Sequence, residues 1–531
     1  MGLCAFLAAP ASASSVYVIR HASWTAADER DYGEFIAAIG ASGCRSVDSC
    51  LHDRANPFAA SDPKGARFAS DCADLPYVLR FYYAWHRDLP FSYVADVAPR
   101  GHASDIRYSP RGNEIEARHD ILTGADALET LNVLRDAVSS ASYRTDPELE
   151  EPHESDFYSP ALDPKSIRPG TVIYDPNGHL AVIWKVESDG RLRYIDAHPD
   201  NSLTRGFYDL RFVRASPGMG AGFKNWRPSR LEGARTAADG GLGGGHVRLA
   251  SNADIPDFSV TQFYGTGRRP GDWRQGRFVL NGQAMDYYDY VRAEMAGGSL
   301  SFDPEEVADM VNSNCADLSY RADAVKLALE AGLDRQAEPE RLPVNIYGTE
   351  GDWETYSTPS RDARLKTAFK ALRDNEERFM TLYRAHDSRL AYRGDDLAGD
   401  MLQAYDRAAA TCAISYTRSD GSNISFSYEE ARRRLFRLSF DPYQCVERRW
   451  GAQDAELSSC PDGAAKRAWY LAEQSLRNQI DRTYEAKMDW SLEGLRQGGI
   501  GVREPPDIDA RAYLVAQKEK PDALISDVRF R

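Results

Sequence analysis

Long apolar runs, an excess of positive charge and metal-ligand spacings are all missing from this chain. None of its apolar runs approaches the roughly 20 residues that a helix needs to span a bilayer, so no membrane span is expected. The net charge of −15 argues against a nucleic-acid surface and against a polybasic membrane patch. Because the sequence has no Cys-x-x-Cys cluster, no His-x-x-x-His pair and no phosphate-binding loop, we predict neither a metal site nor a cofactor.

The composition is otherwise that of a globular protein with more than one domain. Apolar residues make up 42% of the chain, and 531 residues suffice for two or more sizeable cores. The clearest boundary is the Gly-rich stretch 233–247, which favours a flexible linker. We predict an α+β domain over residues 14–232, where turns, alternating strands and helices are mixed. For residues 248–531 we predict a mainly α-helical domain, because helical periods dominate there, as in the apolar face Leu365, Phe369, Leu372, Phe379 and Leu382.

The N-terminal residues 1–13 are short, apolar and end in Ala11-Ser12-Ala13. This pattern is typical of the end of a secretory signal peptide, here without its positive start, and it predicts a periplasmic or secreted protein. The alternative is an apolar arm that stays on the mature protein.

Cysteine usage also favours export. Without Cys4 the chain keeps seven cysteines, so one thiol stays unpaired if the others form bridges. Disulfides form in oxidising compartments such as a periplasm. The count alone leaves the connectivity open, but the spacing favours Cys44–Cys50, Cys445–Cys460 and Cys315–Cys412. Cys72 is then the cysteine that remains free.

Cys72 stands at the start of an amphipathic helix. Asp71 is a suitable cap, and Leu75, Val78 and Leu79 lie on one helix face. A cysteine in the first helical turn is close to unsatisfied N–H groups, which lower the pKa of a thiol, and its own N–H can stabilise an oxyanion. Pro76 also belongs in a first turn, so the helix can instead begin near Asp74. The alternative for Cys72 is a buried or bridged structural cysteine.

A histidine follows at the start of a predicted buried strand. Residues 169–170 form a turn, 171–174 a short strand and 175–178 a second turn, and His179 opens the apolar run 179–186. A histidine at the end of such a strand can face a thiol and act as a general base. Between the two lies the polar insertion 94–168, with one helical piece near 126–138, which is either a lid or substrate wall or a loop without functional consequence.

The partner strand supplies a residue to orient the histidine. Residues 187–190 form a hairpin turn, and residues 191–197 run back beside the histidine strand. Asp196 and His198 point to the same face of this strand, so either can bind the second ring nitrogen of His179. Asp196 is preferred, because a buried carboxylate also stabilises the imidazolium, and His198 is the reserve. Asp196 can alternatively bind turn backbone at the strand end.

Together, Asp71-Cys72, Pro169-Gly170-Thr171-Val172, Gly178-His179-Leu180-Ala181-Val182-Ile183 and Tyr194-Ile195-Asp196-Ala197 resemble the NlpC-type and CHAP-type cell-wall peptidases. The resemblance covers about half of residues 65–200. It implies a papain-like domain, with a helix packed on an antiparallel sheet, and hydrolysis of amide bonds in peptidoglycan stem peptides through a Cys72–His179–Asp196 triad. The family helix usually carries Asp-Cys-Ser-Gly, where this chain has Asp-Cys-Ala-Asp, and its third residue is often His or Asn.

Two other functions fit parts of the same pattern. The run Asp71-Cys72-Ala73-Asp74-Leu75 also looks like bacterial transglutaminase-like proteases, which would act on proteins as proteases or acyltransferases. A non-catalytic papain-like scaffold would instead bind a protein partner through its helical domain.

Cys315 stands in a run, Asn314-Cys315-Ala316-Asp317-Leu318, that nearly repeats the Cys72 sequence. No Gly-His strand follows it, so we predict a disulfide cysteine at a helix start, where Asn and Asp are ordinary caps. No other motif in residues 248–531 indicates a function.

Overall fold

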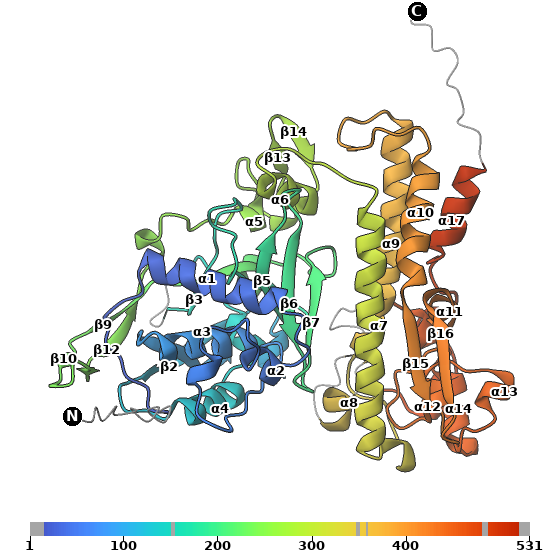
Figure 1. The fold of residues 1–531 in the computed structure, drawn as a ribbon, viewed down its shortest axis with the longest axis horizontal. Coiled ribbons are helices and arrows are strands. Elements are labelled where there is room, and N and C mark those ends of the chain that lie inside the picture. Colours follow the sequence, from blue (N-terminus) through green and yellow to red (C-terminus); the bar gives the residue numbers. More distant parts are fainter. Residues whose placement is uncertain (1–14, 150–153, 347–350, 357–358, 481–486, 520–531) are drawn as a thin grey trace, which may run out of the picture. The chain divides into compact units, whose positions relative to one another are not determined.

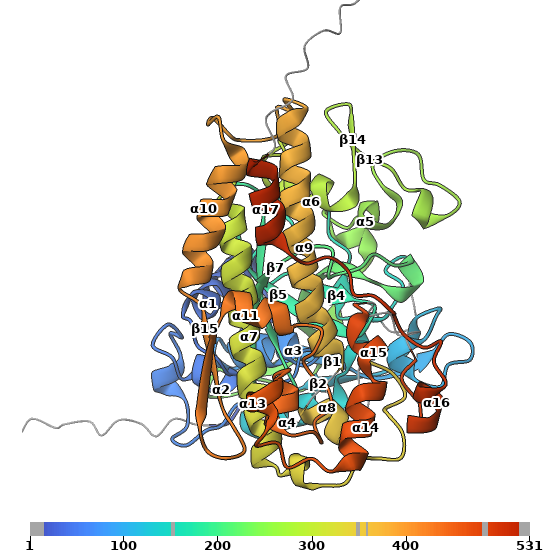
Figure 2. The ribbon, with the colours of Figure 1, turned by 90° about the vertical axis from the view of Figure 1, so that its right-hand side faces the viewer.

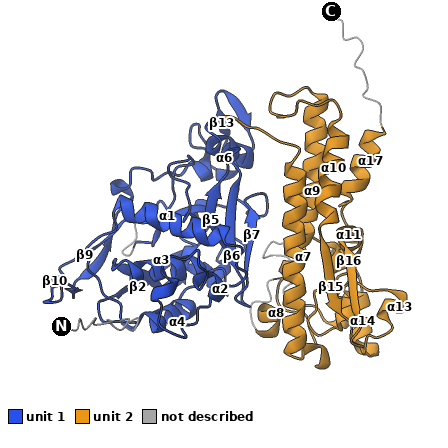
Figure 3. Ribbon diagram, in the orientation of Figure 1, with its two compact units in different colours: residues 1–298 blue, residues 299–531 orange. Residues whose placement is uncertain are grey.

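The computed structural model describes residues 15–149, 154–346, 351–356, 359–480 and 487–519. The predicted signal peptide at residues 1–13 lies outside this part of the chain. Two compact units, residues 1–298 and 299–531, are each described by themselves (Figure 3). Both contain helices and strands, which confirms the mixed α+β class.

Unit 1 is built on a six-stranded antiparallel sheet with the order β3-β8-β4-β5-β6-β7. The predicted histidine strand and its return strand are confirmed as neighbours, β5 and β6, and the short strand before them is β4. In sheet order the strands are β3 Phe157–Tyr158, β8 Gly222–Trp226, β4 Val172–Asp175, β5 His179–Val186, β6 Leu192–Ala197 and β7 Leu203–Phe207.

Both faces of this sheet are covered, which explains why β5 is apolar almost throughout. Helices α1 (Ala26–Ala41) and α3 (Leu75–His86) pack on one face, where Leu180 and Val182 are buried (Figure 1). The alternate residues Ala181 and Ile183 point to the other face, because side chains in a strand alternate with a period of two. There they meet α6 (Tyr287–Met295), which buries Tyr290 and Val291.

The division between the units falls after Gly298, which differs from the predicted linker at 233–247. Residues of that stretch form the short strands β10 (Arg235–Thr236), β11 (Leu242–Gly243) and the start of β12 (His246–Leu249). β12 pairs with β9 (Ser229–Glu232). The physical reason for the later boundary is α6, because this helix covers the second face of the unit 1 sheet.

The insertion 94–168 is folded. β1 (Phe91–Pro99) and β2 (Asn113–Ile121) form an antiparallel ribbon, and α4 (Ala127–Ala137) confirms the predicted helical piece. Two short 3-10 turns, Ile106–Tyr108 and Ser140–Tyr143, flank these elements. The remaining α-helices and strands in the described part of unit 1 are α2 Val47–Leu51, α5 Thr261–Tyr264, β13 Phe278–Leu280 and β14 Gln283–Met285.

Four helices form the body of unit 2, namely α7 (Glu306–Glu330), α9 (Pro359–Arg384), α10 (Leu397–Ala410) and α17 (Ala510–Lys518), and they lie side by side (Figures 1 and 2). The predicted apolar face of residues 365–382 is buried in α9, which confirms that helix. The sequence reading missed a hairpin of β15 (Ala413–Thr417) and β16 (Asn423–Ser427). The shorter helices are α8 Gly351–Tyr356, α11 Tyr428–Arg434, α12 Val446–Arg449, α13 Asp454–Leu457, α14 Ala464–Ala472, α15 Gln474–Asn478 and α16 Leu492–Arg496.

The predicted disulfide pairing is confirmed. The bridges are Cys44–Cys50, Cys315–Cys412 and Cys445–Cys460, and Cys72 is the free cysteine of the described residues. Cys315 lies inside α7 and not at a helix start, so its sequence echo of Cys72 belongs to a structural bridge. Within the described ranges, no helix combines the length and the apolarity that crossing a membrane requires.

Candidate active site

Cys72 lies in a turn that immediately precedes α3, because the helix begins at Leu75. Asp71 Oδ1 accepts hydrogen bonds from the N–H groups of Ala73 (2.7 Å) and Asp74 (3.3 Å), and Asp74 Oδ1 accepts from Asp71 N–H at 2.8 Å. These reciprocal bonds fix the turn. Asp71 therefore caps the turn that carries Cys72, and the helix starts where the alternative reading of Pro76 placed it.

The backbone N–H of Cys72 differs from those of its neighbours in the turn. The N–H groups of Asp71, Ala73, Asp74 and Leu75 all donate to atoms of Asp71 or Asp74. For Cys72 N–H, no acceptor lies among the residues that the structure describes. A free N–H next to a nucleophile can stabilise the negative oxygen of a tetrahedral intermediate.

The Cys72 thiol is held close to the start of β5. Its Sγ lies 3.8 Å from the carbonyl oxygen of Gly178, the residue before His179. Burial and the charge of Asp71 raise the pKa of the thiol well above its ordinary value, and the N–H of Leu180 acts in the opposite direction. The expectation of a lowered thiol pKa was therefore wrong. The reason is that Cys72 precedes the helix instead of lying in its first turn, and that the turn places two carboxyl groups beside the thiol.

Those two carboxyl groups act together. Asp74 is buried, and burial together with its hydrogen bond to Asp71 raises the pKa of the Asp74 carboxyl. Two carboxyl groups in contact cannot both ionise easily, so this contact favours the protonated form of Asp74. Both side chains act on the neighbouring thiol.

His179 begins β5 directly after a tight turn. Gly178 has a φ of 90°, which glycine adopts readily. The His179 ring places Nε2 at 2.8 Å from Asp196 Oδ2. Since a carboxylate accepts hydrogen bonds, Nε2 carries the proton in the neutral ring, and Nδ1 is then the basic nitrogen.

Asp196 is buried in β6, with 1% of its surface exposed. Its Oδ1 accepts a hydrogen bond from the Thr204 hydroxyl. His198 Nε2 lies 3.1 Å from Thr204 Oγ1 and 3.8 Å from Asp196 Oδ2, and its ring centroid is 6.1 Å from that of His179. Asp196 is therefore the residue that binds His179 Nε2. The reserve candidate His198 contacts Thr204 instead and lies beyond hydrogen-bond distance of Asp196 Oδ2.

Parts of the insertion 94–168 contact both segments of the site. The Tyr143 hydroxyl donates to the carbonyl oxygen of Ala73 at 2.5 Å. A Cβ on Gly178 would lie 3.2 Å from the Tyr108 hydroxyl oxygen and 3.5 Å from Ser140 Oγ. The insertion thus packs around the turn that leads into His179 and the turn that carries Cys72. No local sequence signal marks these tyrosines.

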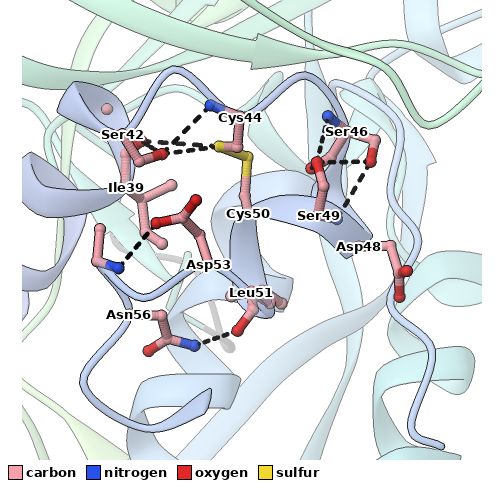
Figure 4. Close-up of a disulfide and its surroundings, with 12 residues drawn as sticks. Ile39, Ser42, Cys44, Ser46, Asp48, Ser49, Cys50, Leu51, Asp53 and Asn56 are labelled. Carbon is pink, nitrogen blue, oxygen red and sulfur yellow. Dashed lines mark hydrogen bonds between the residues drawn. A yellow bond between two sulfur atoms is a disulfide. The ribbon is translucent and has the colours of Figure 1, made fainter.

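The Cys44–Cys50 disulfide closes a short loop (Figure 4). This loop is hydrogen-bonded to the hairpin between β6 and β7. Leu203 N–H donates to Arg45 O at 2.9 Å, and Val47 N–H donates to Asn201 O at 3.1 Å. The Asn201 side chain in turn accepts from Ser70 N–H at 3.0 Å. The hairpin that carries Asp196 and Thr204 is therefore tied to the disulfide loop and to the segment before Cys72.

Among the described residues, the side chains of Cys445, Glu447 and Cys460 lie close enough together to hold a metal ion. Both cysteines are bridged to each other, so neither offers a thiolate. This group is a structural feature of unit 2.

At one end of the sheet the Cys72 thiol thus lies against the residue before His179, and the His179 imidazole is oriented by the Asp196 carboxylate. This set can perform nucleophilic acyl transfer. Comparisons of the chain with protein families, with curated proteins and with solved structures found no match.

Proposed function

We propose that the protein is an exported, papain-like thiol hydrolase that cleaves an amide bond through Cys72, His179 and Asp196. The observation that carries this proposal is the 2.8 Å bond from His179 Nε2 to the buried Asp196 carboxylate, at the strand end that contacts the Cys72 thiol. Peptidoglycan stem peptides are the proposed substrate, on the strength of the sequence resemblance to NlpC-type and CHAP-type peptidases. The three disulfides support export to a periplasm or secretion.

The mechanism begins from a neutral thiol, because its raised pKa keeps the proton on sulfur at rest. As Cys72 Sγ attacks the amide carbonyl carbon, His179 Nδ1 takes the thiol proton and Asp196 stabilises the imidazolium. Cys72 N–H donates to the developing oxyanion. His179 then gives its proton to the leaving nitrogen, and the C–N bond breaks. Water, deprotonated by His179, hydrolyses the resulting thioester and restores the thiol.

Mass spectrometry of purified peptidoglycan after incubation with the mature protein tests this function. We expect new peptide fragments with the wild type and none with Cys72→Ala. Asp196→Asn should lower the rate by about two orders of magnitude, because the orienting carboxylate is lost. Fragments that persist with Cys72→Ala would contradict the thiol mechanism. Intact muropeptides together with cleaved or cross-linked protein substrates would point to the transglutaminase-like alternative.

A non-catalytic scaffold is the second candidate, and the raised pKa of Cys72 favours it. Such a protein would bind a partner through its helical unit 2. The two functions differ in how Cys72 depends on His179. In the hydrolase, His179→Ala slows alkylation of Cys72 near neutral pH, whereas in a scaffold this substitution leaves the rate unchanged.

A further inference from the structure

Thr204 faces Asp196 across two neighbouring strands. The register of β6 and β7 pairs Asp196 directly with Thr204, so their side chains lie next to each other on the same face. The Thr204 hydroxyl donates to Asp196 Oδ1, and His179 Nε2 binds Oδ2 at 2.8 Å. Each oxygen of the carboxylate thus has its own donor.

His198 is a competing donor for the same carboxylate. Since the Thr204 hydroxyl hydrogen points at Asp196, the Thr204 oxygen accepts the Nε2–H of His198 at 3.1 Å. The same His198 nitrogen lies 3.8 Å from Asp196 Oδ2, which is too long for a hydrogen bond but needs only a small carboxylate rotation to become one. The Thr204 hydroxyl therefore accepts the hydrogen bond of His198 Nε2–H and donates to Asp196 Oδ1 at the same time.

We propose that Thr204 is a positioning residue, which holds the Asp196 carboxylate on His179 and keeps it away from His198. The proposal rests on the Cys72–His179–Asp196 function proposed above. Without the hydroxyl, Asp196 Oδ1 loses a donor and His198 loses an acceptor, so these two groups pair with each other. His179 Nε2 then loses its acceptor, and the ring is no longer fixed with Nδ1 as the basic nitrogen.

Arg205 is a charged neighbour of Asp196 that cannot replace Thr204. Arg205, next along β7, feels the charge of Asp196, but its guanidinium donates to the carbonyl oxygens of Gly40 at 2.6 Å and Cys44 at 2.7 Å. These bonds hold Arg205 on the disulfide loop. Thr204 is therefore the side chain that separates Asp196 from His198.

The rate of Cys72 alkylation by iodoacetamide, measured against pH in the full chain, tests the proposal without a known substrate. His179→Ala gives the rate without the imidazole. We expect Thr204→Val to lower the rate near neutral pH about tenfold, towards that of His179→Ala, which is the effect of losing one buried hydrogen bond to a charged group. Thr204→Ser keeps the hydroxyl and should retain the wild-type rate. Thr204→Ala serves in place of valine if the latter does not fold.

The double variant Thr204→Val/His198→Phe separates positioning from a merely structural role. It removes the competing donor, so the alkylation rate near neutral pH should return to within about threefold of the wild type. A merely structural role would instead lower the melting temperature further and leave the rate as low as in Thr204→Val. Wild-type behaviour of Thr204→Val, with a slow His179→Ala, would overturn the proposal and leave the triad standing. An unchanged rate in His179→Ala would overturn both.

Discussion

At the scale of single residues, burial and the neighbouring carboxyl groups of Asp71 and Asp74 together raise the pKa of the Cys72 thiol. The two side chains also accept hydrogen bonds from each other's backbone N–H groups. A single substitution leaves one carboxyl that can carry a negative charge alone. The charge is removed only when both residues are changed.

We therefore expect Asp71→Asn/Asp74→Asn to lower the pKa of Cys72 and to increase its alkylation rate near neutral pH by about tenfold. Asparagine keeps the Oδ1 acceptors that form the turn. The measurement is the pH dependence of iodoacetamide labelling, followed by mass spectrometry of the Cys72 peptide. Asp136→Asn, on the exposed face of α4, is the matched control and should have no effect. A lower rate in the double variant would contradict this account.

At the scale of elements, the Cys44–Cys50 loop is predicted to support the site as well as the stability of unit 1. Closing a loop with a sequence separation of 6 contributes about 2 kcal/mol through chain entropy. Cys44→Ser/Cys50→Ser should lower stability by that amount and speed hydrogen exchange at Val47 and Leu203, whose N–H groups donate across the contact between this loop and the hairpin. Cys72 alkylation should slow in parallel.

The disulfide Cys445–Cys460 provides the control for that experiment. It closes a loop with a sequence separation of 15 in unit 2, away in sequence from the site. Cys445→Ser/Cys460→Ser should destabilise unit 2 while the alkylation rate of Cys72 stays unchanged. Equal effects of the two double variants on Cys72 would show that the loop at Cys44 has no special role.

The elements differ in how far the sequence could predict them. The hairpin of β5 and β6 is local, and the period of two places Asp196 beside His179 once the turn at 187–190 is recognised. The Asp71–Asp74 contact and the effect of both residues on the thiol depend on burial, which no local pattern reveals. Thr204 could be placed only once the register of β7 was known.

The domain boundary shows the same limit. Helix α6 has an ordinary amphipathic sequence, and nothing in it indicates whether it packs on the sheet of unit 1 or among the helices of unit 2. Helix α6 packs on unit 1 because the second face of the sheet would otherwise be exposed, and this depends on the tertiary structure. The Gly-rich stretch 233–247 looked like a linker because glycines favour both flexible segments and tight turns.

At the scale of the whole molecule, buried carboxyl groups make the stability of unit 2 depend on pH. Asp441 and Glu473 are fully buried, and Gln444 donates to both, at 3.1 Å and 3.2 Å. Burial and the charge of Asp441 raise the pKa of Glu338 to about 10 and that of Glu473 to about 8. A raised carboxyl pKa stabilises the fold fully below the pKa of the unfolded chain, and this stability is lost as the pH rises towards the folded value.

We expect unit 2 to lose stability from about pH 5 to about pH 7, with the melting temperature falling by about 2 °C or more. Above about pH 7 Lys366 contributes a rise of the stability of unit 2 with pH, because burial lowers the pKa of this lysine to about 7. Glu338→Gln should flatten the dependence, and the exposed neighbour Glu340→Gln should not. Hydrogen exchange of unit 2 peptides in the full chain is the measurement, and a rise in protection from pH 5 to pH 7 would refute the assignment.

The position of Cys72 between the bridged cysteines has a consequence for biogenesis. Cys44 and Cys50 leave the ribosome before Cys72 and are only 6 residues apart, so their bridge can close before another partner exists. Cys315 must wait for Cys412, 97 residues later, while Cys72 is already present as a reduced thiol. Because the thiolate is the attacking species in thiol–disulfide exchange, the groups that keep Cys72 protonated also slow its entry into mixed disulfides. The features that hold the nucleophile at rest thus protect it while the chain is being oxidised.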